Sequence, residues 1–224
     1  IGHINGKVAF VDGALPGEIV KAQYQRNRSQ FSELKAIEVM RPANTRTSPP
    51  CAYAGACGGC SLQHWRSDAQ LTFKEDMLID QFSRIASVRA EDYTLLPQLQ
   101  AKTLGYRRKA RLAARYVAKK GGVLLGFREK GSGFVMDMNH CEILSAEVGC
   151  LIGPLRSLLD GLDGREKIPQ IEIAVGEVSS EAESDKVVAL VLRHLAQLSG
   201  SDLQALLNFG ERERVEIYLQ PGGE

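Results

Sequence analysis

The chain has 224 residues, of which 44% are hydrophobic and 25% are charged, and its formal net charge is +1. This composition is that of a soluble globular protein with enough apolar material for one good core or two modest ones. It excludes a membrane protein, because no apolar run approaches the roughly 18 residues that a membrane helix needs.

Residues 1–4 lack the basic and apolar regions of a signal peptide, and five cysteines are an odd count for a disulfide scaffold. We therefore expect a cytoplasmic protein, a monomer with no membrane partner. Because the chain does not begin with Met, we also expect a trimmed or expressed fragment.

The first fifty residues contain three short runs that predict strands, separated by turn residues such as Asp12-Gly13 and Pro16-Gly17. The runs span residues 6–10, 18–24 and 32–39. Short strands with such turns predict a small β-barrel of the OB type, which we assign to residues 1–43. Residues 44–65 are expected to form a linker and a cysteine loop, and residues 66–224 a second domain.

Three cysteines lie within ten residues, in the stretch Cys51-Ala-Tyr-Ala-Gly-Ala-Cys57-Gly-Gly-Cys60, and Cys141 follows far along the chain. The glycines in this stretch permit the tight curl that would bring three thiolates to one point. Thiolates suit zinc or an iron–sulfur cluster, and both need about four such ligands. The spacing therefore predicts a metal site made by Cys51, Cys57, Cys60 and Cys141.

Zinc sites usually consist of two short pairs of ligands, whereas this chain has a triplet and a distant single cysteine. We therefore favour a [4Fe-4S] cluster over zinc and over disulfides. His64 and His140 lie near the cysteines in sequence and leave a mixed Cys/His zinc site open, although surface or capping roles are the more ordinary ones. Cys150 lies on an apolar helical pattern and is expected to be a buried packing residue.

Residues 67–85 predict a helix with one apolar stripe, which we interpret as core packing. The stripe consists of Leu71, Leu78, Phe82 and Ile85.

Positive charge is concentrated in one segment. Residues 101–130 hold ten Lys and Arg against one acidic residue, and residues 131–224 hold seven against sixteen. Within residues 106–117 most cations occupy odd positions and most apolar residues even ones, so a strand here would bury one face and expose the other. The exposed charges would stand about 7 Å apart, close to the phosphate spacing of a single nucleic-acid strand.

A turn at residues 119–122 should return the chain as a partner strand over 123–128. Phe127 beside Arg128, and Phe134 in the next loop, are placed to meet unpaired bases. A solvated strand face with aromatic residues in the core is the alternative. The residues that we assign to RNA binding are Arg107, Lys109, Arg111, Arg115, Phe127 and Arg128.

The rest of the chain predicts helices over residues 146–152 and 201–209, a further short helix starting near Pro154, and strands over 168–175, 186–194 and 214–220. Ser145 is expected to cap the first helix, and Ser201 or Asp202 the last. The predicted fold class is thus α+β: a small OB-like barrel followed by a mixed α/β domain with a largely antiparallel sheet and a cysteine loop.

The combined pattern resembles the ribosomal RNA uracil-5-methyltransferases of the RumA/RlmD type. The resemblance lies in the N-terminal β-unit, the cysteine stretch continuing to His64, and three later stretches, Gly105-Tyr-Arg-Arg-Lys-Ala-Arg-Leu112, Leu125-Gly-Phe-Arg128 and Asn139-His-Cys141-Glu-Ile-Leu144. It implies an OB-like TRAM domain, a central domain with a [4Fe-4S] cluster on Cys51, Cys57, Cys60 and Cys141, and 23S ribosomal RNA, in a single-stranded or loop region, as the partner.

The resemblance also implies a C-terminal domain that binds S-adenosylmethionine, and the residues of that domain are missing. There is no Gly-rich cofactor loop after a strand and no Ser-Cys-Asn-Pro nucleophile motif in the chain. We therefore assign no catalytic and no cofactor-binding residue, and we expect S-adenosylmethionine to be used only by the full-length enzyme and this fragment to be inactive.

Two other functions stay open. One is a stand-alone RNA-binding module with a structural zinc or iron–sulfur site. The other is a radical methylthiotransferase, which is disfavoured because that motif has three and then two intervening residues, whereas this chain has five and two.

Overall fold

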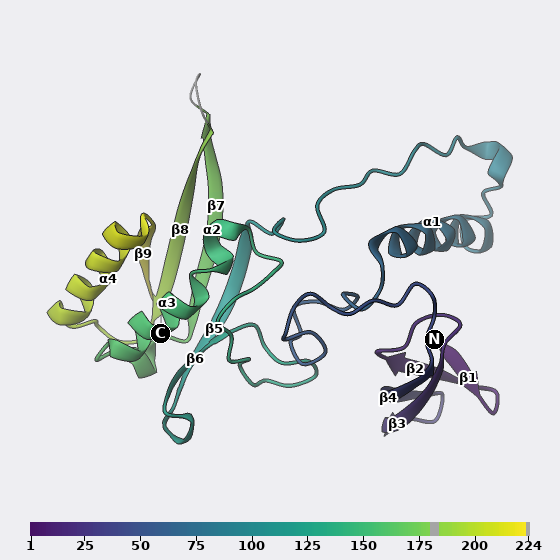
Figure 1. Cartoon of the computed structure of the whole chain (residues 1–224), viewed down its shortest axis with the longest axis horizontal. Helices are drawn as coiled ribbons and strands as arrows, with labels where there is room; N and C mark the ends of the chain where they lie inside the picture. The colour runs from purple at the N-terminus through teal and green to yellow at the C-terminus, as the bar shows by residue number, and fades with distance from the viewer. Residues whose placement is uncertain (180–183, 223–224) are drawn as a thin grey trace. The chain divides into compact units, whose positions relative to one another are not determined.

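The computed structural model describes residues 1–179 and 184–222. They form two compact units (Figure 1), and each is described by itself. The N-terminal unit consists of Ile1–Pro50 and Leu62–Leu99, and the cysteine unit of Cys51–Ser61 and Gln100–Glu224. Over the described ranges, no helix has both the length and the apolar character that crossing a membrane requires.

The N-terminal unit contains one sheet, with strand order β1-β2-β4-β3. Its strands are β1 (Gly2–Ile4), β2 (Lys7–Asp12), β3 (Ile19–Asn27) and β4 (Phe31–Arg41). The three predicted strands correspond to β2, β3 and β4, and β1 is additional. β2 pairs with β4 in parallel, while the other two pairings are antiparallel.

The prediction of a barrel is wrong for this unit, because the sheet is open. β1 has three residues and pairs with β2, and β3 pairs with β4. No pairing joins the two edge strands within the described residues. A barrel needs that closing pairing and a matching stagger of the strands, which β1 is too short to supply.

The buried carboxylate of Glu18 connects this sheet by hydrogen bonds to the segment that follows β4. The Glu18 side chain has no exposed area, and it accepts hydrogen bonds from the Leu15 and Ala43 backbone N–H groups at 2.8 and 3.1 Å. The Arg46 guanidinium donates two more, at 2.5 and 2.6 Å. These bonds, that of Arg46 first, lower the pKa of Glu18 to about 2.

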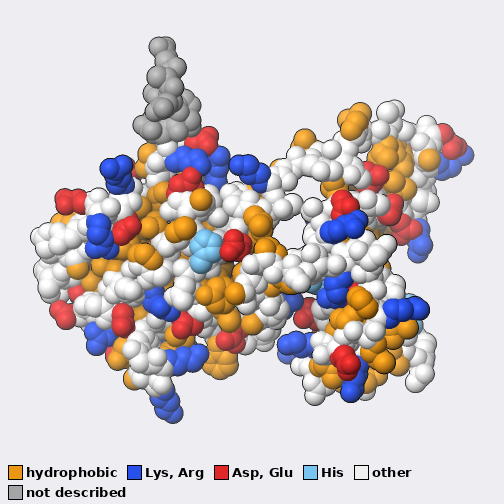
Figure 2. Space-filling model, in the orientation of Figure 1, with side chains coloured by type: hydrophobic (Ala, Val, Ile, Leu, Met, Phe, Trp, Pro, Cys, Tyr) orange, Lys and Arg blue, Asp and Glu red, His pale blue; other side chains and the backbone are white. Residues whose placement is uncertain are grey.

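Helix α1 (Ser67–Arg84) confirms the predicted helix, and the short 3-10 helix η1 (Ala90–Asp92) follows it. The interpretation of its apolar stripe as core packing is wrong, because no residue of α1 is buried. Leu78 is 48% exposed and Ile85 80%. Hydrophobic side chains accordingly reach the surface around this helix in Figure 2. Phe73 instead packs against Trp65, with 5.1 Å between ring centroids, so the helix contacts its own entry loop.

The cysteine unit contains a five-stranded sheet with strand order β6-β5-β7-β8-β9. Its strands are β5 (Lys109–Val117), β6 (Gly122–Gly126), β7 (Gln170–Ser179), β8 (Ser184–His194) and β9 (Glu216–Pro221). The first three pairings are antiparallel, as predicted, but β8 and β9 are parallel, so the sheet is mixed.

Helices cover one face of this sheet. They are α2 (Ala146–Gly149), α3 (Ile152–Gly161) and α4 (Gly200–Glu213), with 3-10 turns η2 (Ala118–Lys120) and η3 (Arg165–Lys167). Leu112, Ile171 and Leu190 are fully buried in the same core as Leu155 and Phe209 of the helices. Because strand residues alternate between faces, the odd positions of β5 lie on the opposite, open face.

Some local predictions fail at helix ends. Ser199, two residues before Ser201 and three before Asp202, caps α4, and it accepts from the Asp202 N–H at 3.1 Å. Ser145 does lie at the N-cap of α2 but makes no capping bond with its side chain. Cys150 is exposed rather than buried, because α2 ends at Gly149 and the apolar pattern does not continue through it as one helix.

Candidate cysteine site and nucleic-acid interface

The four predicted ligands Cys51, Cys57, Cys60 and Cys141 all belong to the cysteine unit. Backbone bonds fix the cysteine loop, residues 51–61, against the segment that leads to Cys141. The Gly58 N–H donates to the Arg128 carbonyl at 2.8 Å, and the Lys130 N–H donates to the Ala56 carbonyl at 2.8 Å.

Tyr53 adds a side-chain bond to this attachment, because its hydroxyl accepts from the Asn139 N–H at 3.0 Å. This hydrogen bond thus attaches the loop to Asn139, two residues before Cys141 in the chain. Cys57 and Cys141 are buried, at 7% and 5% exposure, and Cys60 packs against the same core.

Two glycines make this close approach possible. A Cβ atom at Gly58 would lie 2.9 Å from the Arg128 carbonyl oxygen, closer than real side chains approach. A Cβ at Gly59 would lie 3.3 Å from the Phe127 ring and 3.4 Å from the Cys57 sulfur. Gly58 is therefore required by space, and a side chain at Gly59 would be tightly packed. Gly55, at φ +89°, is required by backbone conformation.

The other three predicted ligands lie close enough to Cys57 to act on its thiol electrostatically. Burial raises the pKa of the Cys57 thiol, and the charges of Cys60, Cys141 and Cys51 raise it further, while the Gly59 N–H lowers it. That N–H donates to the Cys57 sulfur at 3.4 Å. None of the five cysteines, all within the described residues, is in a disulfide.

Across the part of the chain that the structure describes, no group of three or more His, Cys, Asp and Glu side chains is arranged to hold a metal ion. The two histidines near the cysteines in sequence are His140 and His64. His140 faces Glu142, at 3.4 Å, and His64 belongs to the N-terminal unit.

The structure places Lys109, Arg111 and Arg115 on one strand, β5, and all three are exposed while Leu112 and Ala114 are buried. The predicted alternation of charged and apolar faces is therefore confirmed. Arg107 precedes the strand and lies over the Phe127 ring, with its guanidinium carbon 5.9 Å from the centroid.

The six predicted RNA-binding residues differ in their partners. Arg111 is paired with Glu172 of β7 at 2.7 Å, and Arg128 donates to the Gly133 carbonyl at 2.6 Å. Lys109 and Arg115 have no ion pair or side-chain hydrogen bond within residues 1–179 and 184–222. These two are consequently the cations best placed to meet a phosphate.

Strand register adds two residues that the sequence analysis missed. Arg193 of β8 lies opposite Gln170, which lies opposite Ala113 of β5, so Arg193 shares the open face with the cationic row. Tyr218 of β9 pairs with Val191 on the same face and is 52% exposed. Only the pairing of strands far apart in sequence reveals this, so no local signal could have found them.

Comparison with known proteins shows what the chain is similar to. No protein-family model matches it. A 23S rRNA (uracil(1939)-C(5))-methyltransferase RlmD of Nitrosococcus oceani is 43% identical over 223 residues, which is 100% of this chain and 48% of that protein.

Proteins of the same name from Burkholderia ambifaria and Alkalilimnicola ehrlichii are 43% and 42% identical, over 97% and 100% of this chain and 45% and 48% of their own lengths. The chain therefore spans about half the length of the curated relatives it matches. The resemblance to RumA/RlmD-type methyltransferases is confirmed by these relatives.

Proposed function

We propose that this chain, a relative of the RlmD-type methyltransferases, is the RNA-binding and [4Fe-4S]-carrying part of an enzyme that methylates C5 of a uridine in 23S ribosomal RNA. The observation that carries the proposal is 43% identity to such an enzyme over 100% of this chain. Because the chain spans 48% of that relative, methyl transfer from S-adenosylmethionine is proposed for the whole protein, and this chain alone is expected to be inactive. Its place of action would be the cytoplasm, together with the RNA.

The N-terminal sheet is proposed to be the TRAM-type unit of this enzyme, with residues 1–43 as its extent. The open sheet does not itself support this proposal; the exposed side chains do, since β3 presents Lys21, Tyr24 and Arg26 to solvent. Cations beside an exposed aromatic ring suit a flexible RNA strand, whose phosphates and bases they contact in turn.

The four cysteines are proposed to hold a [4Fe-4S] cluster. Burial of Cys57 and Cys141 and the Gly59 N–H on the Cys57 sulfur fit a set of thiolate ligands. A single zinc ion would need sulfurs about 3.8 Å apart, from Zn–S bonds of ~2.3 Å in a tetrahedron. Three closely spaced cysteines and one distant cysteine, in place of the two short pairs usual for zinc, favour the larger cluster. The cluster would supply iron–thiolate bonds that tie residues 51–60 to Cys141, a structural role.

The first test is anaerobic purification of the chain, followed by iron, sulfide and zinc analysis and an absorption spectrum. About four iron per chain with absorption near 400 nm is expected. Cys141→Ser should lose most of the iron, whereas the matched variant Cys150→Ser, at an exposed cysteine outside the site, should retain it. One zinc in a colourless protein would refute the cluster and favour an RNA-binding module with a zinc site.

RNA binding is tested with a single-stranded 23S rRNA fragment in a salt series. Lys109→Ala and Arg115→Ala should each weaken binding and reduce the slope of log K against log salt by about one. Arg111→Ala should cost less, because Glu172 already neutralises that cation. Arg212→Ala on α4, on the helix-covered side of the sheet, is the control. Equal effects of all four variants would contradict the assignment of the open face.

A further inference from the structure

A hollow opens at the edge of β5 beside the start of its neighbour β7. Ala113 pairs with Gln170, the first residue of β7, while β5 continues to Val117. Pro169 directly precedes β7, and its carbonyl accepts a hydrogen bond from the Ala114 N–H at 2.9 Å. Beyond that bond lies a hollow of about 600 Å³. Its lining residues include Ala113, Arg115, Tyr116, Arg128, Glu166 and Pro169.

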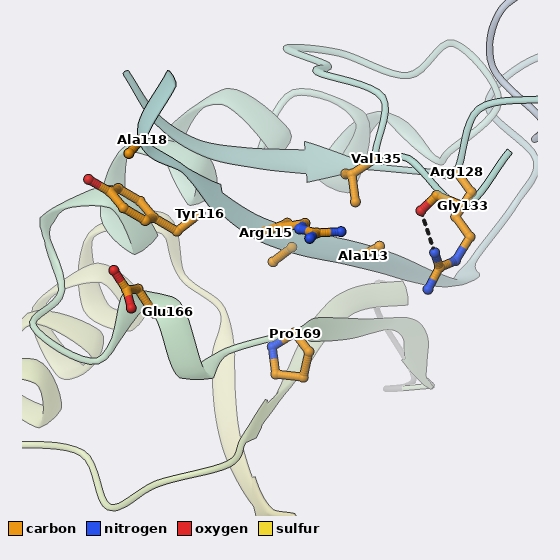
Figure 3. A pocket seen from close by; sticks show the side chains of 10 residues that line it. Ala113, Arg115, Tyr116, Ala118, Arg128, Gly133, Val135, Glu166 and Pro169 are labelled. Atoms are coloured by element: carbon orange, nitrogen blue, oxygen red, sulfur yellow. Dashed lines mark hydrogen bonds between the residues drawn. The ribbon is translucent and has the colours of Figure 1, made fainter. Parts of the chain in front are cut away.

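The two ends of this hollow differ in charge (Figure 3). Arg115 points along the floor toward the end that holds Arg128, while Tyr116 and Glu166 lie together at the other end. Arg115 has no side-chain partner among the described residues, and Arg128 uses one guanidinium nitrogen on the Gly133 carbonyl. An arginine carries five N–H donors, so the cationic end retains donors for a phosphate.

The opposite end has the features of a base site. The Arg165 guanidinium carbon lies 5.0 Å from the centroid of the Tyr116 ring, and this contact holds the ring in position. Glu166 has no hydrogen bond or ion pair within the described part of the chain, and it lines the hollow at the end where Tyr116 lies. An ionised carboxylate accepts N–H donors and repels phosphate, so it would orient a nucleotide with its base at this end.

We propose that this hollow binds one unpaired nucleotide of the RNA, with its phosphate on Arg115 and Arg128 and its base at Tyr116 and Glu166. The volume lies within the range of about 300–1,000 Å³ for small-molecule sites. This rests on the proposed RNA-binding function and adds base specificity to it.

The carboxylate selects the base. Guanine presents its N1–H and an N2–H side by side, so it can donate two bonds to one carboxylate. Adenine and cytosine offer one exocyclic amino group each, and uracil offers a single N–H between two carbonyl oxygens, which a carboxylate repels. The site should therefore prefer guanosine and reject uridine, so its nucleotide is a neighbour of the methylated uridine and not that uridine itself.

The experiment titrates the whole chain with 5′-GMP, 5′-AMP, 5′-CMP and 5′-UMP, observed by NMR, and separately with RNA oligomers that carry one G or one U in an otherwise uniform strand. GMP should bind at least about tenfold more tightly than UMP. Glu166→Gln should reduce this preference below about threefold, because an amide accepts with one oxygen only. Arg128→Ala should weaken all four nucleotides alike, and Glu211→Gln, an exposed carboxylate on α4, should change nothing.

The outcomes separate this site from the proposed function. If oligomers bind, and Lys109→Ala weakens them, but neither GMP nor the G-containing oligomer is preferred, the nucleotide site is refuted and RNA binding stands. If GMP is preferred through Glu166 but no oligomer binds, the hollow is a mononucleotide site and the RNA-binding function is refuted. If mononucleotides and oligomers both fail to bind, both proposals fall.

Discussion

Replacing Glu18 with Gln should destabilise the N-terminal unit at neutral pH. The Glu18 carboxylate accepts four hydrogen bonds in a site with no exposed side-chain area, and its pKa falls from 4.5 to about 2. A shift of about 2.5 units corresponds to ~3 kcal/mol of folding free energy at pH 7. Gln keeps the shape but removes the charge, leaving the guanidinium of Arg46 largely buried without its counter-ion.

The pH dependence follows from the sign of the shift. A carboxylate whose pKa is lowered by folding contributes its full stability above its unfolded value of 4.5, and that stability is lost as the pH falls toward 2. The difference between the native protein and Glu18→Gln should therefore be about 3 kcal/mol at pH 7 and should become small near pH 2.

The chain carries its own probe for this measurement. Trp65 is the single tryptophan, belongs to the same unit as Glu18, and donates from its indole nitrogen to the Thr45 hydroxyl at 3.1 Å. Its fluorescence in urea at several pH values reports the unfolding of that unit. Glu38→Gln, at an exposed position of β4, is the control. A loss below about 0.5 kcal/mol at pH 7, or a loss that does not depend on pH, would refute the reasoning.

Two further predictions concern the cysteine unit. Gly58→Ala should lower the free energy of unfolding by about 1–3 kcal/mol and lower the iron content, because its Cβ would lie 2.9 Å from the Arg128 carbonyl oxygen. The control is Gly161→Ala, which has nothing within 4 Å and should lower that free energy by less than ~0.5 kcal/mol. Equal stability of the two variants in urea denaturation would contradict this. Asp202→Ala should lower the free energy of unfolding by roughly 2–4 kcal/mol, measured by thermal unfolding. The Asp202 side chain is only 2% exposed, and its carboxylate accepts hydrogen bonds from three backbone N–H groups at 2.7–3.3 Å. A loss of stability below ~1 kcal/mol would count against this prediction.

Local pattern predicted the elements well. The alternation in residues 106–117 gave strand β5 with the correct buried face, because a period of two residues is a local property. Helix α1 likewise begins at Ser67, as expected. Whether the N-terminal sheet is open or closed was not predictable in this way, since it depends on whether its edge strands pair with each other. The parallel pairing of β2 with β4 was not predictable either, because it leaves no pattern in the sequence of either strand.

The site was predictable in its residue types but not in its pairings. Cationic positions on β5 follow from the sequence, whereas neutralisation of Arg111 requires the register that places Glu172 opposite it. The prediction that α1 is buried was wrong for a similar reason. An apolar stripe states that a helix can be buried, but which surface covers it is set by tertiary structure.

The cysteine loop is in contact with residues that we propose to bind RNA. Phe127 packs beside Gly59 of the loop and carries Arg107 over its ring. The backbone of Arg128, the next residue, accepts the Gly58 N–H, while its side chain lines the hollow beside β5. Three predicted RNA contacts, Arg107, Phe127 and Arg128, thus depend on the position of the loop. Tying the loop to Cys141 would fix those contacts before RNA arrives, so less conformational entropy is lost on binding.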